Sequence, residues 1–211
     1  SIAVVRGCFG GCAFCSLGFH QGKIVQSRSE RSVLGEARAL TRSPRFRGTI
    51  ADLGGPTANM YMLGCRSDKA RRRCRRPSCL YPEICGNLET DHGAQIRLLR
   101  AVRRVPGVKH VFVGSGIRHD LALCDARYLE TLVAGHVGGH LKVAPEHVAA
   151  PVLRLMRKPP FERFVEFQRR FEAISRRAGK EQYVVPYLIA GHPGSDRSAV
   201  AQLEREMRRM R

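Results

Sequence analysis

The sequence predicts an α/β fold in which helices pack against a parallel β-sheet. Short apolar runs, typical of buried strands, alternate along the chain with longer segments whose apolar residues recur at helical spacing. Turn residues such as Gly and Pro separate the two kinds of segment. Because parallel strands are joined by crossover helices, this alternation indicates consecutive βα units around one sheet.

Five strands are expected. Residues 2–5 form an apolar run directly before a cysteine-rich loop, and residues 48–53 end in the turn Gly54-Gly55-Pro56-Thr57. The other three runs are also short, apolar and bounded by turn residues. These further strands are expected at residues 110–113, 140–143 and 183–189.

The expected helices follow the strands. Residues 29–40 carry apolar side chains at positions 33, 34, 37 and 40, and Ser29 or Ser32 is a suitable N-cap. For the final helix the N-cap is Ser195 or Asp196. The remaining helices are expected at residues 93–104, 125–134, 149–156, 161–177 and from 195 onward.

Length and composition indicate a globular protein. The 211 residues, 43% hydrophobic and 26% charged, suffice for a sizeable core. No run of about 18 apolar residues is present, so no membrane span is expected. The chain starts with Ser and ends inside a charged helical pattern without a stop signal, so we expect a segment cut at both ends.

The chain is strongly basic. It has 37 Lys and Arg against 18 Asp and Glu, a net charge of +19. Such a field attracts nucleic acids, acidic lipids or anionic substrates. Most of the basic residues are Arg, which a codon bias would also produce, and we favour that explanation.

Three cysteines near the start form a CxxxCxxC motif. Cys8, Cys12 and Cys15 flank Gly10 and Gly11, which permit the positive φ values that tight wrapping of a loop requires. Disulfide frameworks are typical of short secreted chains without a core, so this clustering favours metal. Structural zinc and ferredoxin clusters take four ligands each, whereas three thiolates leave one iron of a four-iron cluster open.

This motif resembles that of the radical S-adenosylmethionine (SAM) superfamily, CxxxCxΦC, with Phe14 at the aromatic position. The resemblance implies that Cys8, Cys12 and Cys15 bind a [4Fe–4S] cluster and that SAM chelates the open iron. It implies reductive cleavage of SAM to a 5′-deoxyadenosyl radical that acts on an unknown substrate. It also implies a partial (βα)6 TIM-like barrel, whose sixth strand would lie beyond Arg211.

Motifs at later strand ends resemble the YgiQ-type branch of that superfamily. They are Asp52-Leu-Gly-Gly-Pro-Thr-Ala-Asn-Met-Tyr61, Leu141-Lys-Val-Ala-Pro-Glu-His147 and Gly191-His-Pro-Gly194. In βα barrels the active site lies at the C-terminal ends of the strands, so one pocket can collect these motifs. The resemblance places Gly54, Gly55, Pro56 and Thr57 near the SAM amino group, with Pro56 replacing the usual Glu.

The last two strand ends add further SAM contacts by resemblance. Lys142 and Glu146 are charged residues beside a buried strand, so they pair with each other or face a polar ligand. His147 is expected to cap or pack rather than to catalyse. The resemblance implies that Ile189, Gly191 and His192 lie beside the adenine, although Tyr187 departs from the family pattern.

Residues 60–91 are expected to form a Cys-rich insertion within a core that spans residues 1–211. Cys65, Cys74, Cys79 and Cys85 are separated by eight, four and five residues and contain no CxxC pair. They suit zinc or an auxiliary iron–sulfur cluster, or else a structural role as reduced or disulfide-paired thiols. Cys124 stands alone and is expected to be buried.

Part of this insertion is very basic. Residues 66–76 include seven Lys and Arg and one Asp, but no aromatic residue for base stacking. Solvated charge is therefore favoured over a nucleic-acid site.

Together these features predict a radical SAM enzyme in a reducing, cytoplasmic compartment, with no membrane partner and a reductant such as flavodoxin or ferredoxin. Two alternatives stay open. One is a metal-stapled basic RNA-binding module, and RNA also stays open as a substrate. The other is an iron–sulfur protein with an electron-transfer or structural role. No residue can be named as the hydrogen donor or acceptor for the substrate.

Overall fold

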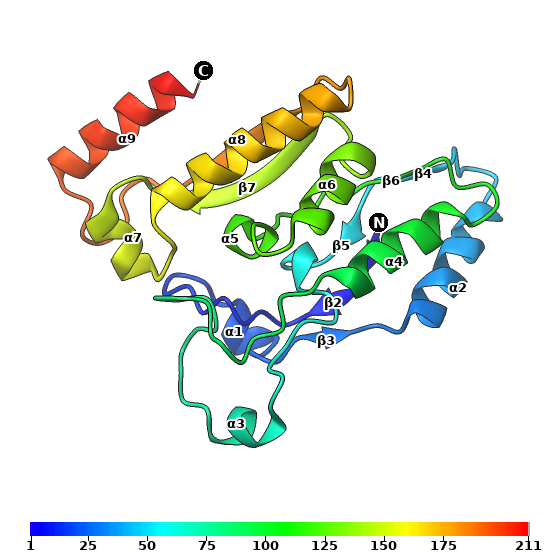
Figure 1. Cartoon of the computed structure of the whole chain (residues 1–211), viewed down its shortest axis with the longest axis horizontal. Coiled ribbons are helices and arrows are strands. Elements are labelled where there is room, and N and C mark those ends of the chain that lie inside the picture. Colours follow the sequence, from blue (N-terminus) through cyan, green and yellow to red (C-terminus); the bar gives the residue numbers. More distant parts are fainter. Residues whose placement is uncertain (211) are drawn as a thin grey trace.

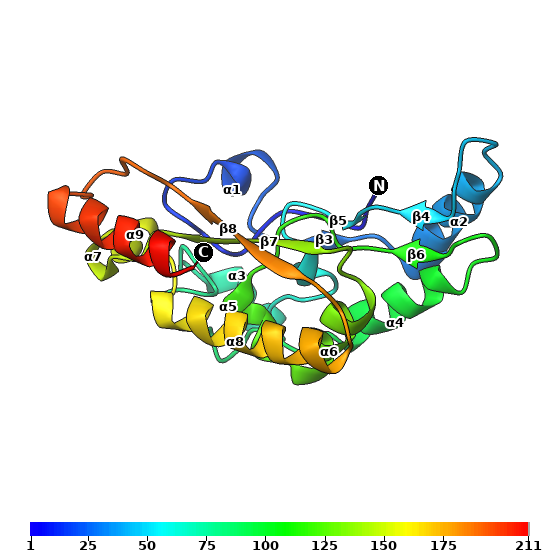
Figure 2. The same cartoon turned by 90° about the horizontal axis from the view of Figure 1, so that it is seen from above.

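Short strands form one layer, and helices α4, α6 and α8 lie along one face of it (Figures 1 and 2). The computed structural model describes residues 1–210. The strands are β1 (Ile2–Ala3), β2 (Val5–Arg6), β3 (Gln26–Ser27), β4 (Thr49–Ile50), β5 (Leu53–Gly54), β6 (His110–Val111), β7 (His140–Glu146) and β8 (Tyr183–Leu188).

The helices fill the connections between strands. They are α1 (Leu17–His20), α2 (Glu30–Thr41), η1 (Ala58–Met60, a 3-10 turn), α3 (Asp68–Arg73), α4 (Gly93–Arg103), α5 (His119–Ala122), α6 (Ala126–Gly135), α7 (Ala150–Met156), α8 (Phe161–Arg177) and α9 (Arg197–Arg209). All six expected helices are present. The short elements α1, β3, η1, α3 and α5 were not expected, because a single turn or a two-residue strand leaves no periodicity in the sequence.

The parallel strands neighbour one another in chain order. The pairs β1–β5, β4–β6 and β7–β8 are parallel, and only β2–β3 is antiparallel. The Leu53 amide donates to the Phe112 carbonyl at 2.8 Å, and an isolated parallel bridge joins Ile117 to Val143. These contacts connect the pairs across the layer. Within residues 1–210 no sheet is closed, and the expected barrel with a sixth strand beyond Arg211 stays a prediction.

Helix starts follow the capping chemistry expected of Ser and Asp. The Ser29 hydroxyl accepts from the Ser32 amide at 3.3 Å at the start of α2. Asp125 caps α6 in the same way. At the start of α9 the cap is Asp196, whose carboxylate accepts from the Ala199 amide at 2.7 Å.

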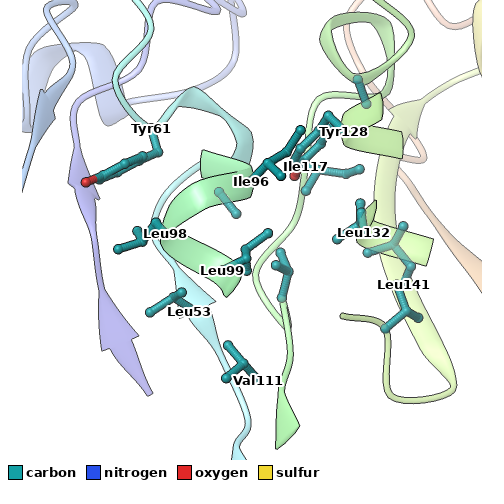
Figure 3. Packing of buried hydrophobic residues seen from close by; sticks show 14 of the residues in the cluster. Leu53, Tyr61, Ile96, Leu98, Leu99, Val111, Ile117, Tyr128, Leu132 and Leu141 are labelled. Atoms are coloured by element: carbon teal, nitrogen blue, oxygen red, sulfur yellow. The ribbon is translucent and has the colours of Figure 1, made fainter. Parts of the chain in front are cut away.

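The core lies between the strand layer and its helices. Figure 3 shows Leu53 and Val111, from neighbouring strands, directed toward Leu99 of α4, and Leu141 of β7 beside Leu132 of α6. All five side chains are at most 2% exposed. Each such buried side chain contributes roughly 1.5–3 kcal/mol. The helices therefore stay attached to one face of the strands.

The insertion, residues 60–91, has a small apolar cluster of its own. Met60, Leu63, Leu80 and Leu88 pack there against Phe9 of the N-terminal cysteine loop. An isolated antiparallel β-bridge between the backbones of Cys65 and Leu88 joins the two ends of the insertion. In Figure 1 the part around α3 extends from the body of the molecule.

Two further expectations concern single features. Cys124, expected to be buried, is exposed; it lies in the short connection between α5 and α6. In the described part of the chain, no helix is long and apolar enough to cross a membrane.

Candidate functional site

The loop after β2 carries Cys8, Cys12 and Cys15. A side chain at Gly10 would place its Cβ 3.2 Å from Cys8 Sγ and 3.9 Å from Cys12 Sγ, so these two sulfurs flank the glycine. The Cys15 amide donates to the Cys12 carbonyl at 3.2 Å, which turns the third thiol back along the loop. A side chain at position 10 would therefore crowd the Cys8 sulfur.

The neighbouring Gly11 serves a different purpose. It has a φ of +62°, the left-handed region that glycine tolerates without strain. A Cβ at this position would lie 2.2 Å from the Pro77 carbonyl oxygen. The expected positive φ is confirmed at Gly11, and here it brings the loop against the Cys-rich insertion.

Two strand ends contact the first two thiols. Cys8 Sγ lies 3.7 Å from Thr57 Oγ1, at the turn after β5. Arg118 Nη1 donates to Cys12 Sγ at 3.4 Å from the segment after β6. Both partners are buried, at 8% and 6% exposure, so these contacts form away from solvent.

The end of α7 and the segment after β8 contact the rest of the loop. The Ala13 amide donates to the Met156 carbonyl at 3.0 Å, at the end of α7, which follows β7. The Phe14 ring meets the His192 ring edge to face, with centroids 6.2 Å apart, after β8. The residues 8–15 loop, which follows the first expected strand, is thus contacted by segments after the second, third and fifth expected strands and by the end of α7.

Arg118 is held by a buried ion pair. Its Nε and Nη2 donate to the two carboxylate oxygens of Asp120 at 2.9 and 2.6 Å. Asn59 fixes the Arg118 backbone by accepting from its amide and donating to its carbonyl, both at 2.9 Å. Burial alone would raise the pKa of Asp120, but the Arg118 charge outweighs burial and lowers that pKa. The pair is therefore ionised.

A second buried charge lies beside the same loop. Lys158 is 4% exposed, and its ammonium donates to the Ala144 carbonyl at 2.5 Å and lies 3.7 Å from a Glu146 oxygen. Burial lowers the pKa of Lys158 and raises that of Glu146. Glu146 also has a φ of +73°, a costly conformation for a non-glycine residue. Strain of this kind concentrates at functional sites.

Of the two alternatives for Lys142 and Glu146, pairing with each other or facing a polar ligand, the structure contradicts the pairing. Lys142 is exposed on β7, and its ammonium makes no hydrogen bond or ion pair within the described residues. A register irregularity between Val143 and Glu146 and the positive φ at Glu146 turn the carboxylate toward Lys158.

Gly54 and Gly55 are required by close strand packing. A Cβ on Gly54 would lie 2.4 Å from Ser115 Oγ, and one on Gly55 would lie 2.6 Å from Val5 Cγ2. Polar backbone groups of both glycines also form hydrogen bonds. The Gly54 carbonyl accepts from the Val4 amide at 2.7 Å, and the Gly55 amide donates to Ser115 Oγ at 3.2 Å. Pro56, which follows, is half-buried.

The end of β8 runs beside Glu146. The Ile189 amide donates to the Glu146 carbonyl at 2.7 Å, and Gly191 has a φ of +71°. His147 is fully buried, and its Nδ1 accepts from the Ala149 amide at 3.0 Å just before α7, so it packs there without capping the helix. Ser195 Oγ lies 3.4 Å from the other ring nitrogen of His147.

Sequence reasoning missed Arg118, Asp120 and Lys158. Arg118 and Asp120 follow the strand expected at residues 110–113. Their position after a strand end is the feature of the sequence that could have indicated them. Lys158 ends the segment Val152-Leu-Arg-Leu-Met-Arg-Lys158, which also resembles the YgiQ-type branch, but the resemblance assigns the lysine no role. Its burial depends on the left-handed residue Arg157, which ends α7 at a φ of 56° and turns the chain back.

The four cysteines of the insertion form a second group. Cys65, Cys74, Cys79 and Cys85 all line a cavity of about 760 Å³. All four are free thiols, of which Cys74 is exposed and the other three half-buried. Burial raises the pKa of the Cys79 thiol.

Cysteine thiolates are the ligands that hold iron–sulfur clusters, and they also bind zinc. Among residues 1–210, no three His, Cys, Asp or Glu side chains are grouped as they would be around one metal ion. Cys8 and Cys12 flank Gly10, and Cys15 lies on the same loop.

Known proteins resemble this chain over its full length. No protein-family model matches it. It is 52% identical over 210 residues to a UPF0313 protein of Methanocella arvoryzae, covering 100% of this chain and 35% of the relative. A UPF0313 protein of Shewanella oneidensis is 52% identical over 196 residues, which is 92% of this chain and 25% of that protein.

The UPF0313 protein YgiQ of Salmonella typhimurium is 50% identical over 196 residues, 92% of this chain and 27% of YgiQ. The chain thus spans about a third or less of the length of these relatives. Their names confirm the expected YgiQ likeness and state no activity or cofactor. Along its whole length, the chain is homologous to a segment of the UPF0313 proteins, which include YgiQ.

Proposed function

We propose that this chain is the core of a radical SAM enzyme in which Cys8, Cys12 and Cys15 bind a [4Fe–4S] cluster. One observation carries the proposal: segments that follow three other expected strands contact the three-cysteine loop, through Thr57, Arg118 and His192. Cluster and SAM together would supply a 5′-deoxyadenosyl radical able to abstract hydrogen from a substrate. Three thiolates suit this chemistry because they leave one iron free for SAM.

Arg118 would stabilise the thiolate form of Cys12. Its guanidinium donates to Cys12 Sγ and is held there by Asp120 and Asn59, so little reorganisation is needed on cluster binding. A buried positive charge next to a thiolate offsets the negative charge of the ligand. Hydrogen bonds to cluster sulfurs also raise the reduction potential.

Lys158 and Glu146 would bind the polar end of SAM. Both are held beside the cysteine loop, and their 3.7 Å separation is longer than a strong ion pair. A lysine ammonium has three donors, which suit a carboxylate. The Glu146 carboxylate suits an amino group or ribose hydroxyls. Burial of both groups means that a polar ligand would satisfy them.

The other residues predicted to contact SAM differ in how accessible they are to a ligand. Phe14, which is 40% exposed, and His192 present rings beside the cluster loop, where an adenine can stack. Thr57 keeps a hydroxyl at Cys8, whereas the Gly54 carbonyl and the Gly55 amide are already hydrogen-bonded. Lys142 is exposed on β7 and is not among the residues that we propose to bind SAM.

The proposal implies a reductant, such as flavodoxin or ferredoxin, and a reducing compartment, because exposed thiolates are prone to oxidation. The substrate is not assigned. Exposed Arg side chains at positions 71–76 keep RNA as a candidate binding partner or substrate.

The test is production of 5′-deoxyadenosine by the full-length protein. After anaerobic reconstitution with iron and sulfide, the wild type with SAM and dithionite is expected to release it, as measured by chromatography. Cys12→Ala is expected to release none above the background without dithionite. Cys124→Ala, which removes an exposed cysteine outside both groups, is expected to match the wild type.

Two results would contradict the proposal. Wild-type protein that assembles a cluster but releases no 5′-deoxyadenosine would favour the electron-transfer or structural alternative. RNA binding with a steep salt dependence that is equal in wild type and Cys12→Ala, without SAM cleavage, would favour the RNA-binding module.

A further inference from the structure

The insertion brings four cysteines from separate parts of the sequence to one cavity. Cys65 forms the antiparallel β-bridge with Leu88, and Cys74 directly follows α3 (Figure 1). Cys79 and Cys85 are joined by a hydrogen bond from the Cys85 amide to the Cys79 carbonyl at 2.8 Å. All four line the same cavity of about 760 Å³. Their gathering is a property of the folded insertion and not of any local motif.

The cavity has room for more than a single ion. Four sulfurs around one zinc ion, each about 2.3 Å from it, would lie ~3.8 Å from one another. The four thiols line a cavity of about 760 Å³, which leaves room for a cluster of several metal and sulfide ions. In such a cluster each of the four thiolates would bind one iron.

The cavity also carries positive charge. Lys23, Arg71, Arg75 and Arg76 line it together with the cysteines. The Lys23 ammonium donates to the Arg76 carbonyl, so the segment after the N-terminal cysteine loop contacts the insertion at this cavity. Positive side chains offset the negative charge that four thiolates bring to a cluster. Apolar side chains, among them Phe9 and Leu88, line the rest.

We propose that Cys65, Cys74, Cys79 and Cys85 bind a second iron–sulfur cluster, of the [4Fe–4S] type with four cysteine ligands. This inference does not depend on the proposed reaction, because it concerns a different set of thiols. The second site would give the insertion a metal centre in place of an extensive core. Small loop-rich segments commonly need such a staple.

The second site is joined to the first loop through the backbone. The Cys79 amide donates to the Phe9 carbonyl at 3.0 Å, and Ser78 Oγ donates to the Gly10 carbonyl at 2.6 Å. Ser78 is fully buried. Ligation of Cys79 would therefore also hold in place the segment on which Cys8 and Cys12 lie.

The test counts metal in a full-length variant that lacks the first site. Wild-type protein, reconstituted anaerobically, is expected to hold about eight iron and eight sulfide per chain. The triple variant Cys8→Ala, Cys12→Ala, Cys15→Ala is expected to keep about four of each, with a reduced cluster visible by electron paramagnetic resonance. Adding SAM is expected to leave that spectrum unchanged, because all four irons have a cysteine.

A second variant tests the ligands themselves. In the triple-variant background, Cys74→Ala is expected to abolish the remaining spectrum while circular dichroism stays the same, because Cys74 is exposed and packs little. Cys124→Ala in that background is expected to keep the cluster.

The outcomes separate this inference from the proposed function. The second cluster would be overturned if the triple variant held no iron while the wild type held about four iron atoms per chain and cleaved SAM. That result would leave the enzyme proposal standing. About one zinc per chain in the triple variant would also overturn the second cluster. About four iron in both proteins would support the second cluster and contradict the first.

Discussion

At the scale of the residue, Arg118 connects the cysteine loop to the core. It donates to Cys12 Sγ on one side and forms a bidentate ion pair with Asp120 on the other. Bidentate pairs of this kind are both strong and geometrically specific. Removing one partner of a buried pair leaves an uncompensated charge, which is more costly than removing both.

We therefore expect Arg118→Met to lower the free energy of unfolding by about 3–5 kcal/mol, measured by urea denaturation of the metal-free protein. The double variant Arg118→Met, Asp120→Leu is expected to recover most of this loss, because no buried charge is left unpaired. In the reconstituted double variant, the cluster potential is expected to be more negative than in wild type, since the bond to Cys12 is absent. An unchanged potential would remove Arg118 from the site.

At the scale of the element, Asp125 joins two helices. Its carboxylate accepts from the Arg127 and Tyr128 amides at the start of α6, at 3.0 and 3.3 Å. It also accepts from the His92 amide at 3.0 Å, directly before α4. Asp196, in contrast, caps the peripheral helix α9 through the Ala199 amide alone.

Asp125→Ala is expected to lower the free energy of unfolding by about 2 kcal/mol or more, because a cap is lost and the buried His92 amide loses its acceptor. The matched variant Asp196→Ala is expected to cost about 1 kcal/mol. Urea denaturation of both, in one buffer, gives the comparison. Equal losses would mean that the bond to His92 adds no stability.

At the scale of the whole molecule, buried histidines link stability to pH. His119 is 1% exposed and packs against Phe164 at 5.8 Å between ring centroids. Burial lowers the pKa of His119 to about 3 from an ordinary value of 6.5. Burial also lowers the pKa of His92, His136 and His147. The folded protein therefore binds fewer protons than the unfolded chain in mildly acidic solution.

This stabilisation is complete above the unfolded pKa and declines as the pH falls from 6.5 toward 3. Each such histidine contributes about 1.4 kcal/mol per pH unit within its window. We expect His119→Gln to flatten the loss of stability between pH 6.5 and 5.5, measured by urea denaturation of the metal-free protein. His20→Gln, at an exposed position, is the control and should keep the wild-type slope.

Local patterns predicted much of the fold. The helix at 161–177 is found at those bounds, since Phe164, Phe167 and Phe171 repeat on one helical face and bury it. The prediction of one strand at residues 48–53 was less accurate. That segment is divided into β4 and β5 around Asp52, whose carboxylate accepts from the Gly114 and Ser115 amides at 2.8 Å. That side-chain contact crosses 62 residues of sequence and has no local signal.

The sequence by itself determined the positions and spacing of the cysteines and the periodic helices, because these depend on neighbouring residues. Only the tertiary structure decided that Glu146 meets Lys158 and not Lys142, since a strand irregularity and a positive φ turn it. It also decided that Arg118 reaches Cys12. Pairing between distant charges depends on how strands and loops pack, and packing is set by contacts that no local pattern encodes.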